Sequence, residues 1–136
     1  MKKLALIPLI LLAGCTTIKS LMSWDVAPFD GGEYDRINHL RSTAVLEQSH
    51  CGDVAYMRGV SKEIYDQSIE LTLYSSSIPH NSDTVKMIKD LDTITNGFYE
   101  RYVKNSTVST AYCQDKLTII ENTTAIIQAA VANKPR

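Results

Sequence analysis

Apolar residues recur every three or four positions along most of the chain after Glu33, the spacing that places them on one face of an α-helix. The pattern is clearest near the C-terminus, where the spacings alternate between four and three. This stripe consists of Cys113, Leu117, Ile120, Thr124, Ile127 and Val131. Ile119 and Ile126 adjoin the stripe, and we expect them to widen it. The pattern predicts a last helix that follows the break at 105–107, which also supplies its N-cap, and that frays at 133–136.

Two further helices are predicted in the middle of the chain. The first repeats an apolar residue every seven positions, and the second has spacings of three and four. The first carries Met57, Ile64, Leu71 and Ile78, and the second carries Val85, Ile88, Leu91, Ile94, Phe98 and Tyr102. Pro79 is predicted to end the first of them, because the residue before a proline avoids the helical region of backbone space.

A still earlier helical pattern begins at Glu33. Its apolar stripe consists of Ile37, Leu40, Ala44, Val45 and Cys51. This stripe would continue at position 58, whereas the next pattern starts from Met57. Either the chain breaks at Gly52, or one continuous helix absorbs a small phase shift. We favour a kink or break near Gly52, after which Asp53 is a good helix N-cap.

These patterns predict an all-α protein, a small antiparallel helical bundle of three to four helices over residues 33–136. Two short segments, 70–74 and 107–112, alternate as β-strands do. Each lies within a longer helical register, and length favours the helix.

Residues 15–32 lack a regular period, and Pro28 and Gly31-Gly32 interrupt regular structure. We interpret this segment as an extended tether that precedes the bundle. Trp24 and Phe29 are expected either to dock on the bundle or to contact the membrane interface, where Trp is common.

Residues 1–14 have the organisation of a secretory signal peptide, with a positive start, a short apolar core and small residues at the end. The apolar run from Leu4 to Leu12 is shorter than the roughly 20 residues that a membrane-spanning helix needs. It leads into Leu12-Ala13-Gly14-Cys15, which resembles the lipobox of bacterial lipoproteins. The alternatives are an ordinary signal peptide and a buried apolar segment with a chance cysteine.

In the lipoprotein family the leader is cut before the cysteine, which is then acylated on its sulfur and its new amino group. The resemblance implies that residues 1–14 are removed and that Cys15 carries the lipid, palmitate included. Two or more acyl chains anchor a protein stably, whereas one does so only marginally. An Asp after the cysteine tends to retain family members at the inner membrane. Thr16 and Thr17 stand there instead, which implies the periplasmic face of the outer membrane in a Gram-negative host.

The chain has three cysteines. If lipid occupies Cys15, Cys51 and Cys113 remain as a pair in an oxidising compartment. Both belong to apolar stripes of different predicted helices, so inward-facing sulfurs can meet. We predict a Cys51–Cys113 disulfide, with two buried free thiols as the alternative.

The charge balance excludes some partners. The full chain has a formal net charge of −1, and removal of Lys2 and Lys3 with the leader makes the mature domain more acidic. A mildly acidic domain without a basic cluster argues against nucleic acid as a partner. It also argues against binding to anionic lipids through a cluster of basic residues.

The sequence offers no recognisable catalytic or cofactor site. None of the three histidines, His39, His50 and His80, lies three or four residues from another, so no helical histidine pair for a metal exists. A zinc site normally needs four ligands in recognisable spacing, and the sequence does not supply them. His50 and Cys51 are adjacent, and adjacent residues on a helix do not face each other. Carboxylate pairs such as Asp90/Asp92 and Glu63/Asp66 are ordinary for a solvated helix face. We therefore expect no enzyme activity, no metal and no cofactor.

Tyrosine is the one over-represented residue, with seven copies against two of phenylalanine. Tyrosine offers a large contact area with a polar tip, which suits protein interfaces. The possible interface residues are Trp24, Phe29, Tyr65, Tyr99 and Tyr102. The alternative is that the tyrosines fill the edge of a small core with their hydroxyls in water.

Taken together, these features predict a lipid-anchored, disulfide-linked periplasmic protein that binds an envelope protein in an accessory, exclusion or assembly role. A second hypothesis is the outer-membrane lipoprotein subunit of a phage spanin, which disrupts the host envelope during lysis. The small size and the lipobox agree with the spanin family. A compact bundle agrees less well, because members of that family are often short, extended or proline-rich.

Overall fold

The computed structural model describes residues 26–136, which form four α-helices and one short 3-10 helix. The elements are α2 (Gly31–Leu46), η1 (Glu47–His50), α3 (Val54–Ser76), α4 (Ser82–Lys104) and α5 (Thr110–Ala132). No strand occurs in this part of the chain. The prediction of an all-α bundle is confirmed, with four helices.

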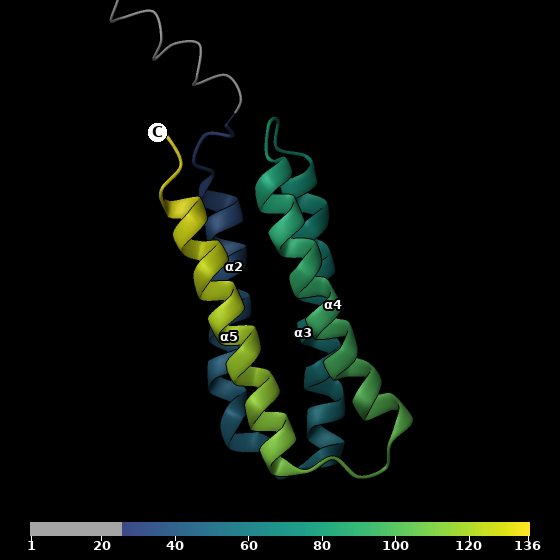
Figure 1. The fold of residues 1–136 in the computed structure, drawn as a ribbon. Helices are drawn as coiled ribbons and strands as arrows, with labels where there is room; N and C mark the ends of the chain where they lie inside the picture. The colour runs from purple at the N-terminus through teal and green to yellow at the C-terminus, as the bar shows by residue number, and fades with distance from the viewer. Residues whose placement is uncertain (1–25) are drawn as a thin grey trace, which may run out of the picture.

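The helices run alternately up and down and form two closely packed pairs (Figure 1). The α2 helix packs mainly along α5, the last helix, and α3 packs mainly along its sequence neighbour α4. The chain therefore enters the bundle at the same end at which α5 finishes. At this end the loop from α3 to α4 also turns.

The boundary between the first two long helices lies where the sequence pattern predicted it. The α2 helix passes into η1, Gly52 follows in a turn, and α3 starts at Val54. The side chain of Asp53 accepts a hydrogen bond from the Tyr56 amide at 3.0 Å, which satisfies one of the free N–H groups of the new helix. The expected break near Gly52 is confirmed.

Two other predicted boundaries were wrong. Gly31-Gly32 form the first turn of α2 rather than a break, because Asp30 caps the helix by accepting from the Glu33 amide at 2.7 Å. The last helix is capped by Ser109, and not by 105–107, which belong to the preceding loop. In both cases a polar side chain just outside the helix determined the start.

Residues 27–30 belong to the folded domain, so the predicted tether, 15–32, extends too far. Ala27 is buried, and its amide donates to the His80 carbonyl at 3.1 Å. The amide of Phe29 donates to the Pro135 carbonyl at 2.8 Å, and its ring packs against the core. The predicted docking of Phe29 is confirmed, whereas Trp24 and Cys15 lie outside the described residues.

The predicted stripes form most of the core, and the α5 stripe from Cys113 to Val131 is buried throughout. Ile119 and Ile126 do not widen it, because their side chains are 42% and 63% exposed. Val85 and Ile78 are only half-buried. The reason is packing: each helix is covered on one side by two neighbours and leaves its opposite side open.

Small polar residues complete the interface between α3 and α4. Ser61, Ser68 and Ser75 recur every seven residues on α3 and are fully buried. The hydroxyl of Ser68 lies 2.7 Å from that of Thr95 on α4, so the two groups satisfy each other. Small side chains let two helices approach closely, which explains why serines are buried between α3 and α4. None of the helices in residues 26–136 has the length and hydropathy that crossing a membrane requires.

Candidate functional site

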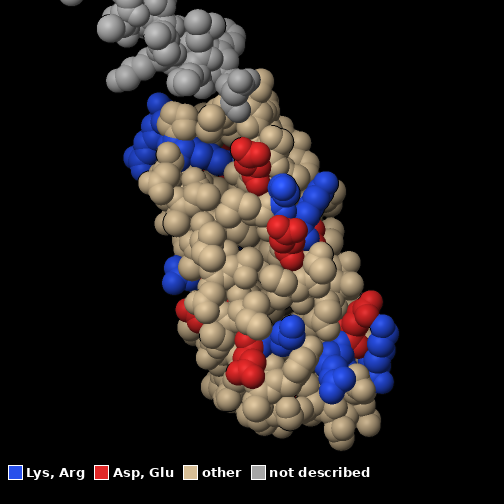
Figure 2. All heavy atoms as spheres, viewed as in Figure 1, with Lys and Arg blue, Asp and Glu red and all other residues tan. Residues whose placement is uncertain are grey.

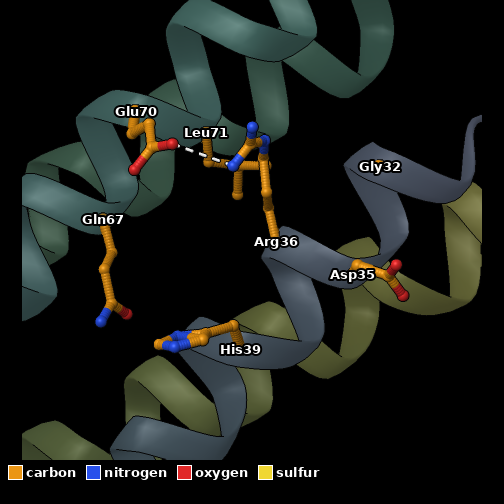
Figure 3. A pocket seen from close by; sticks show the side chains of 7 residues that line it. All are labelled: Gly32, Asp35, Arg36, His39, Gln67, Glu70 and Leu71. Atoms are coloured by element: carbon orange, nitrogen blue, oxygen red, sulfur yellow. Dashed lines mark hydrogen bonds and ion pairs between the residues drawn. The ribbon is translucent and has the colours of Figure 1, made fainter.

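A groove of about 430 Å³ lies between α2 and α3 (Figure 3). Its volume is within the range of small-ligand sites. It is lined by Gly32, Asp35, Arg36, His39, Gln67, Glu70 and Leu71. The polar side chains come from the outer edges of both helices, and Leu71 forms the floor.

Two of the charged residues of the groove, Arg36 and Glu70, are already paired with each other. Nη1 of Arg36 donates to Oε1 of Glu70 at 2.9 Å, which bridges the two helices. The same guanidinium lies 4.5 Å from the ring centroid of Tyr74, within the range of a cation–π interaction. Gln67 donates to Glu63 at 3.1 Å. Arg36 is thus held in place and helps to join α2 to α3.

The groove offers recognition groups of both charges, together with an imidazole and an amide. Within residues 26–136 no three His, Cys, Asp or Glu side chains are arranged to hold a metal ion. The groove is open, and it combines a largely apolar lining with these few polar groups.

An aromatic pair lies on the neighbouring face, between α3 and α4. The rings of Tyr65 and Tyr99 stack with centroids 5.9 Å apart and planes at 15°. Both side chains are half-buried. The two residues were predicted as interface residues from composition, and the fold brings them together. The pair lies close to the exposed Lys62–Asp66 ion pair, which raises the pKa of Lys62.

Tyr102 was also predicted as an interface residue, and that prediction was wrong. Its side chain is fully buried and packs edge-on against Phe98, with ring centroids 5.3 Å apart. Burial raises the pKa of Tyr102. The α4 helix places this residue on the core side, so its ring is unavailable to a partner.

Phe29 contributes to the domain rather than to a free surface. Its ring centroid lies 5.9 Å from that of Tyr34, and the guanidinium carbon of Arg136 lies 5.2 Å from the same ring. Phe29 therefore joins the first residues of the domain to the last.

The predicted disulfide between Cys51 and Cys113 is confirmed, with Cα atoms 5.6 Å apart. It joins the turn before α3 to the first turns of α5, at the end of the bundle opposite to Val26. Beside it, Nδ1 of the exposed His50 lies 3.0 Å from Oε2 of Glu47. Because Cys51 is bonded to Cys113, it is not a nucleophile beside His50.

Sequence reasoning missed a buried polar cluster at the Val26 end. Nζ of Lys134 donates to Oε2 of Glu33 and to Oδ1 of Asn81, both at 2.6 Å. Nδ2 of Asn81 donates to Oε1 of Glu33 at 2.7 Å. Lys134 is thus held firmly, although the pattern placed it in a frayed end. No local signal marks this cluster, because its members come from three distant segments.

Asp92, assigned to a solvated face, is half-buried on α4. It accepts from the Thr72 hydroxyl at 2.6 Å. Burial raises the pKa of Asp92, and the bond from Thr72 opposes this effect. The contact joins α3 to α4 and is structural.

Comparison of this chain with protein-family models, with curated proteins and with solved structures finds no match.

Proposed function

We propose that this chain is a lipoprotein anchored through Cys15 to the periplasmic face of the outer membrane, and that it acts by binding an envelope protein without catalysing a reaction. Its role is accessory, exclusion or assembly. The bundle is the rigid binding body, and the acylated cysteine holds it at the membrane.

The observation that carries this proposal is the cysteine pairing. Cys51 bonds to Cys113, which leaves Cys15 as the cysteine available for a lipid. A disulfide that joins two distant segments also suits an oxidising compartment such as the periplasm. Both facts support the lipobox interpretation of Leu12-Ala13-Gly14-Cys15.

The position of the chain entrance supports the same proposal. Val26 lies at one end of the bundle, and the disulfide lies at the other. The link from Cys15 to Val26 spans at most about 40 Å when fully extended. An anchor at Cys15 therefore keeps the Val26 end within about 40 Å of the membrane and leaves the sides and the disulfide end for a partner.

We propose that the partner contacts the bundle through Tyr65 and Tyr99. Tyrosine rings give large contact areas at a small cost in side-chain entropy, and they are enriched among residues that dominate binding energy. The stacked pair presents two such rings together, one from α3 and one from α4.

Metabolic labelling with radioactive palmitate tests the anchor. We expect label in the wild type and in a Cys51→Ser/Cys113→Ser variant, but none in Cys15→Ala. The double variant is the control, because it alters two cysteines without touching the lipobox. Equal labelling of the wild type and Cys15→Ala would contradict the proposal.

Crosslinking in intact cells, followed by mass spectrometry, tests the binding surface. We expect one envelope protein to be captured by the wild type and lost in Tyr65→Ala/Tyr99→Ala. Tyr56→Ala is the matched control, because Tyr56 is an exposed tyrosine on the same helix, near the disulfide end. Loss of the partner in Tyr56→Ala, with retention in the double variant, would place the interface elsewhere.

The spanin hypothesis rests on the lipobox and the small size of the chain. It predicts a captured partner that has a single N-terminal membrane-spanning helix in the inner membrane. Capture of an outer-membrane or soluble periplasmic protein would instead support the accessory role.

A further inference from the structure

The outward face of α5 carries a second seam, which is uncharged and partly apolar, separate from the stripe that faces the core. Its residues are spaced alternately by three and four, as in the seam of a coiled coil. They are Ile119, Asn122, Ile126, Ala129 and Asn133, and all five are exposed. Ile119 and Ile126 are large hydrophobic residues, and both are exposed to solvent rather than packed in the core.

This seam is free of charge along its whole length. Figure 2 shows that charged side chains are sparse along α5. The nearest acidic residue within the helix, Glu121, is half-buried and lies toward α2, and Asp115 precedes the seam by one turn. An uncharged helix face with two exposed isoleucines seven residues apart is a candidate interaction surface.

The other long helices present charged outer faces. Lys62, Asp66 and Glu70 are exposed on α3, and Lys86, Lys89, Glu100 and Lys104 are exposed on α4. On α2, Asp35, Asn38 and Ser42 face outward, and exposed aliphatic residues occur only in the last turn. The α5 seam is thus distinct among the outer helix faces of the described bundle.

We propose that two copies of this chain associate side by side through their α5 seams, with the two helices parallel. The orientation rests on the proposed anchoring through Cys15. Both copies are then tethered to the same membrane through the end of the bundle at which the chain enters. A two-fold axis along the membrane normal is the symmetry that satisfies this condition.

Charge explains why α5, and not another helix, forms this contact. In a symmetric parallel pair each seam residue meets its own counterpart on the other copy. Lysine would meet lysine on α4, and aspartate would meet aspartate on α3, which is unfavourable. On α5, isoleucine meets isoleucine and asparagine meets asparagine. Asp115 lies at the solvent-exposed end, where salt screens its repulsion.

Single cysteines test the contact and its direction in the full-length anchored protein. We expect Ile119→Cys and Asn133→Cys each to form a disulfide-linked dimer on mild oxidation in membranes. Wild type and Lys62→Cys, which places the thiol on the outer face of α3, should form no disulfide-linked dimer and should migrate as monomers on the same denaturing gel. Crosslinking only when Ile119→Cys and Asn133→Cys are mixed would show an antiparallel pair and overturn the proposal, as would the absence of any dimer.

Sedimentation in detergent tests the contact without a crosslink. We expect Ile126→Lys to weaken self-association by about tenfold or more, since a like charge then meets its copy. Leu73→Lys is the matched control, because Leu73 is 69% exposed on α3, and it should leave association unchanged. The same preparations are assayed for palmitate. Dimers without label would refute the anchor alone, and label without dimers would refute the α5 contact alone.

Discussion

Lys134 and Glu33 form a buried ion pair between the last and first residues of the domain, with Nζ 2.6 Å from Oε2. The lysine side chain is 7% exposed and the glutamate side chain 0%. Asn81, at the start of α4, bonds to both. The pair therefore ties the first turn of α2 to the residue that follows α5 by two positions, at the end where the chain enters.

Removing the cation from this pair should destabilise the domain strongly. We expect Lys134→Met to lower the free energy of unfolding by about 3 kcal/mol, because Glu33 then remains buried without its charge partner. Urea denaturation measures this as a lower midpoint at an unchanged slope. Glu33→Gln/Lys134→Met should recover much of the loss, since no uncompensated charge remains.

Lys104→Met is the control, because it breaks an ion pair with Glu100 that is open to solvent. Its unfolding midpoint should stay close to that of the wild type. Equal losses in Lys104→Met and Lys134→Met would show that burial of the Glu33 pair is energetically unimportant.

The disulfide should contribute substantially to stability. Its cysteines are separated by 62 residues. A disulfide that closes a loop of this length restricts the conformations of the unfolded chain. In the chain-entropy model it raises the free energy of unfolding by about 4 kcal/mol. We expect Cys51→Ser/Cys113→Ser to unfold at a clearly lower urea concentration than the oxidised wild type. Wild type treated with a reductant should behave like the double variant, and coincident curves for oxidised and reduced protein would refute the prediction.

Two adjacent glycines should respond differently to alanine. Nothing lies near a Cβ at Gly31, whereas a Cβ at Gly32 would come within 2.3 Å of the Tyr74 hydroxyl. Gly31→Ala should stabilise α2 by up to about 1 kcal/mol through helix propensity. Gly32→Ala gains the same propensity but must displace the hydroxyl, which donates to Asp30 at 3.0 Å, at a cost of about 1 kcal/mol.

Thermal unfolding of both variants in wild-type and Tyr74→Phe backgrounds measures this difference. In Tyr74→Phe the hydroxyl is gone, while the ring carbon that lies 3.0 Å from a Cβ at Gly32 remains, so the difference between the two alanine variants should shrink. An unchanged difference in that background would assign the cost at Gly32 to something other than the Tyr74 hydroxyl.

Tyr102 should make stability fall at alkaline pH. Burial raises the pKa of Tyr102, so the folded state holds this proton more tightly than the unfolded state. Its contribution is fully present below the unfolded pKa of about 10 and is lost as the pH rises through the folded value. Chemical denaturation of wild type and Tyr102→Phe between pH 8 and 11, roughly the range around that value, should show a smaller alkaline decline in the variant.

The same substitution should cost little near neutral pH. Within residues 26–136 no group forms a hydrogen bond with the Tyr102 hydroxyl. A buried hydroxyl without a partner is unfavourable, so its removal should leave stability unchanged or raise it by up to about 1 kcal/mol. A large loss in Tyr102→Phe at pH 7 would instead indicate that the hydroxyl has a stabilising contact.

The amino-acid sequence by itself determined the helical class, the break near Gly52 and the centre of each buried stripe. These features depend on residues a few positions apart, and local spacing records such relationships directly. The disulfide was also predictable, because two cysteines remained after Cys15 was assigned to lipid and both lay in apolar stripes.

Only the tertiary structure decided how wide each buried face is. Ile119 adjoins an apolar stripe and Tyr102 belongs to one. In the structure the isoleucine faces outward and the tyrosine lies in the core. The spacing defines the middle of a stripe, whereas the position of neighbouring helices defines its edges. The contact between Lys134 and Glu33 depends on where two distant segments meet, so no local pattern could predict it.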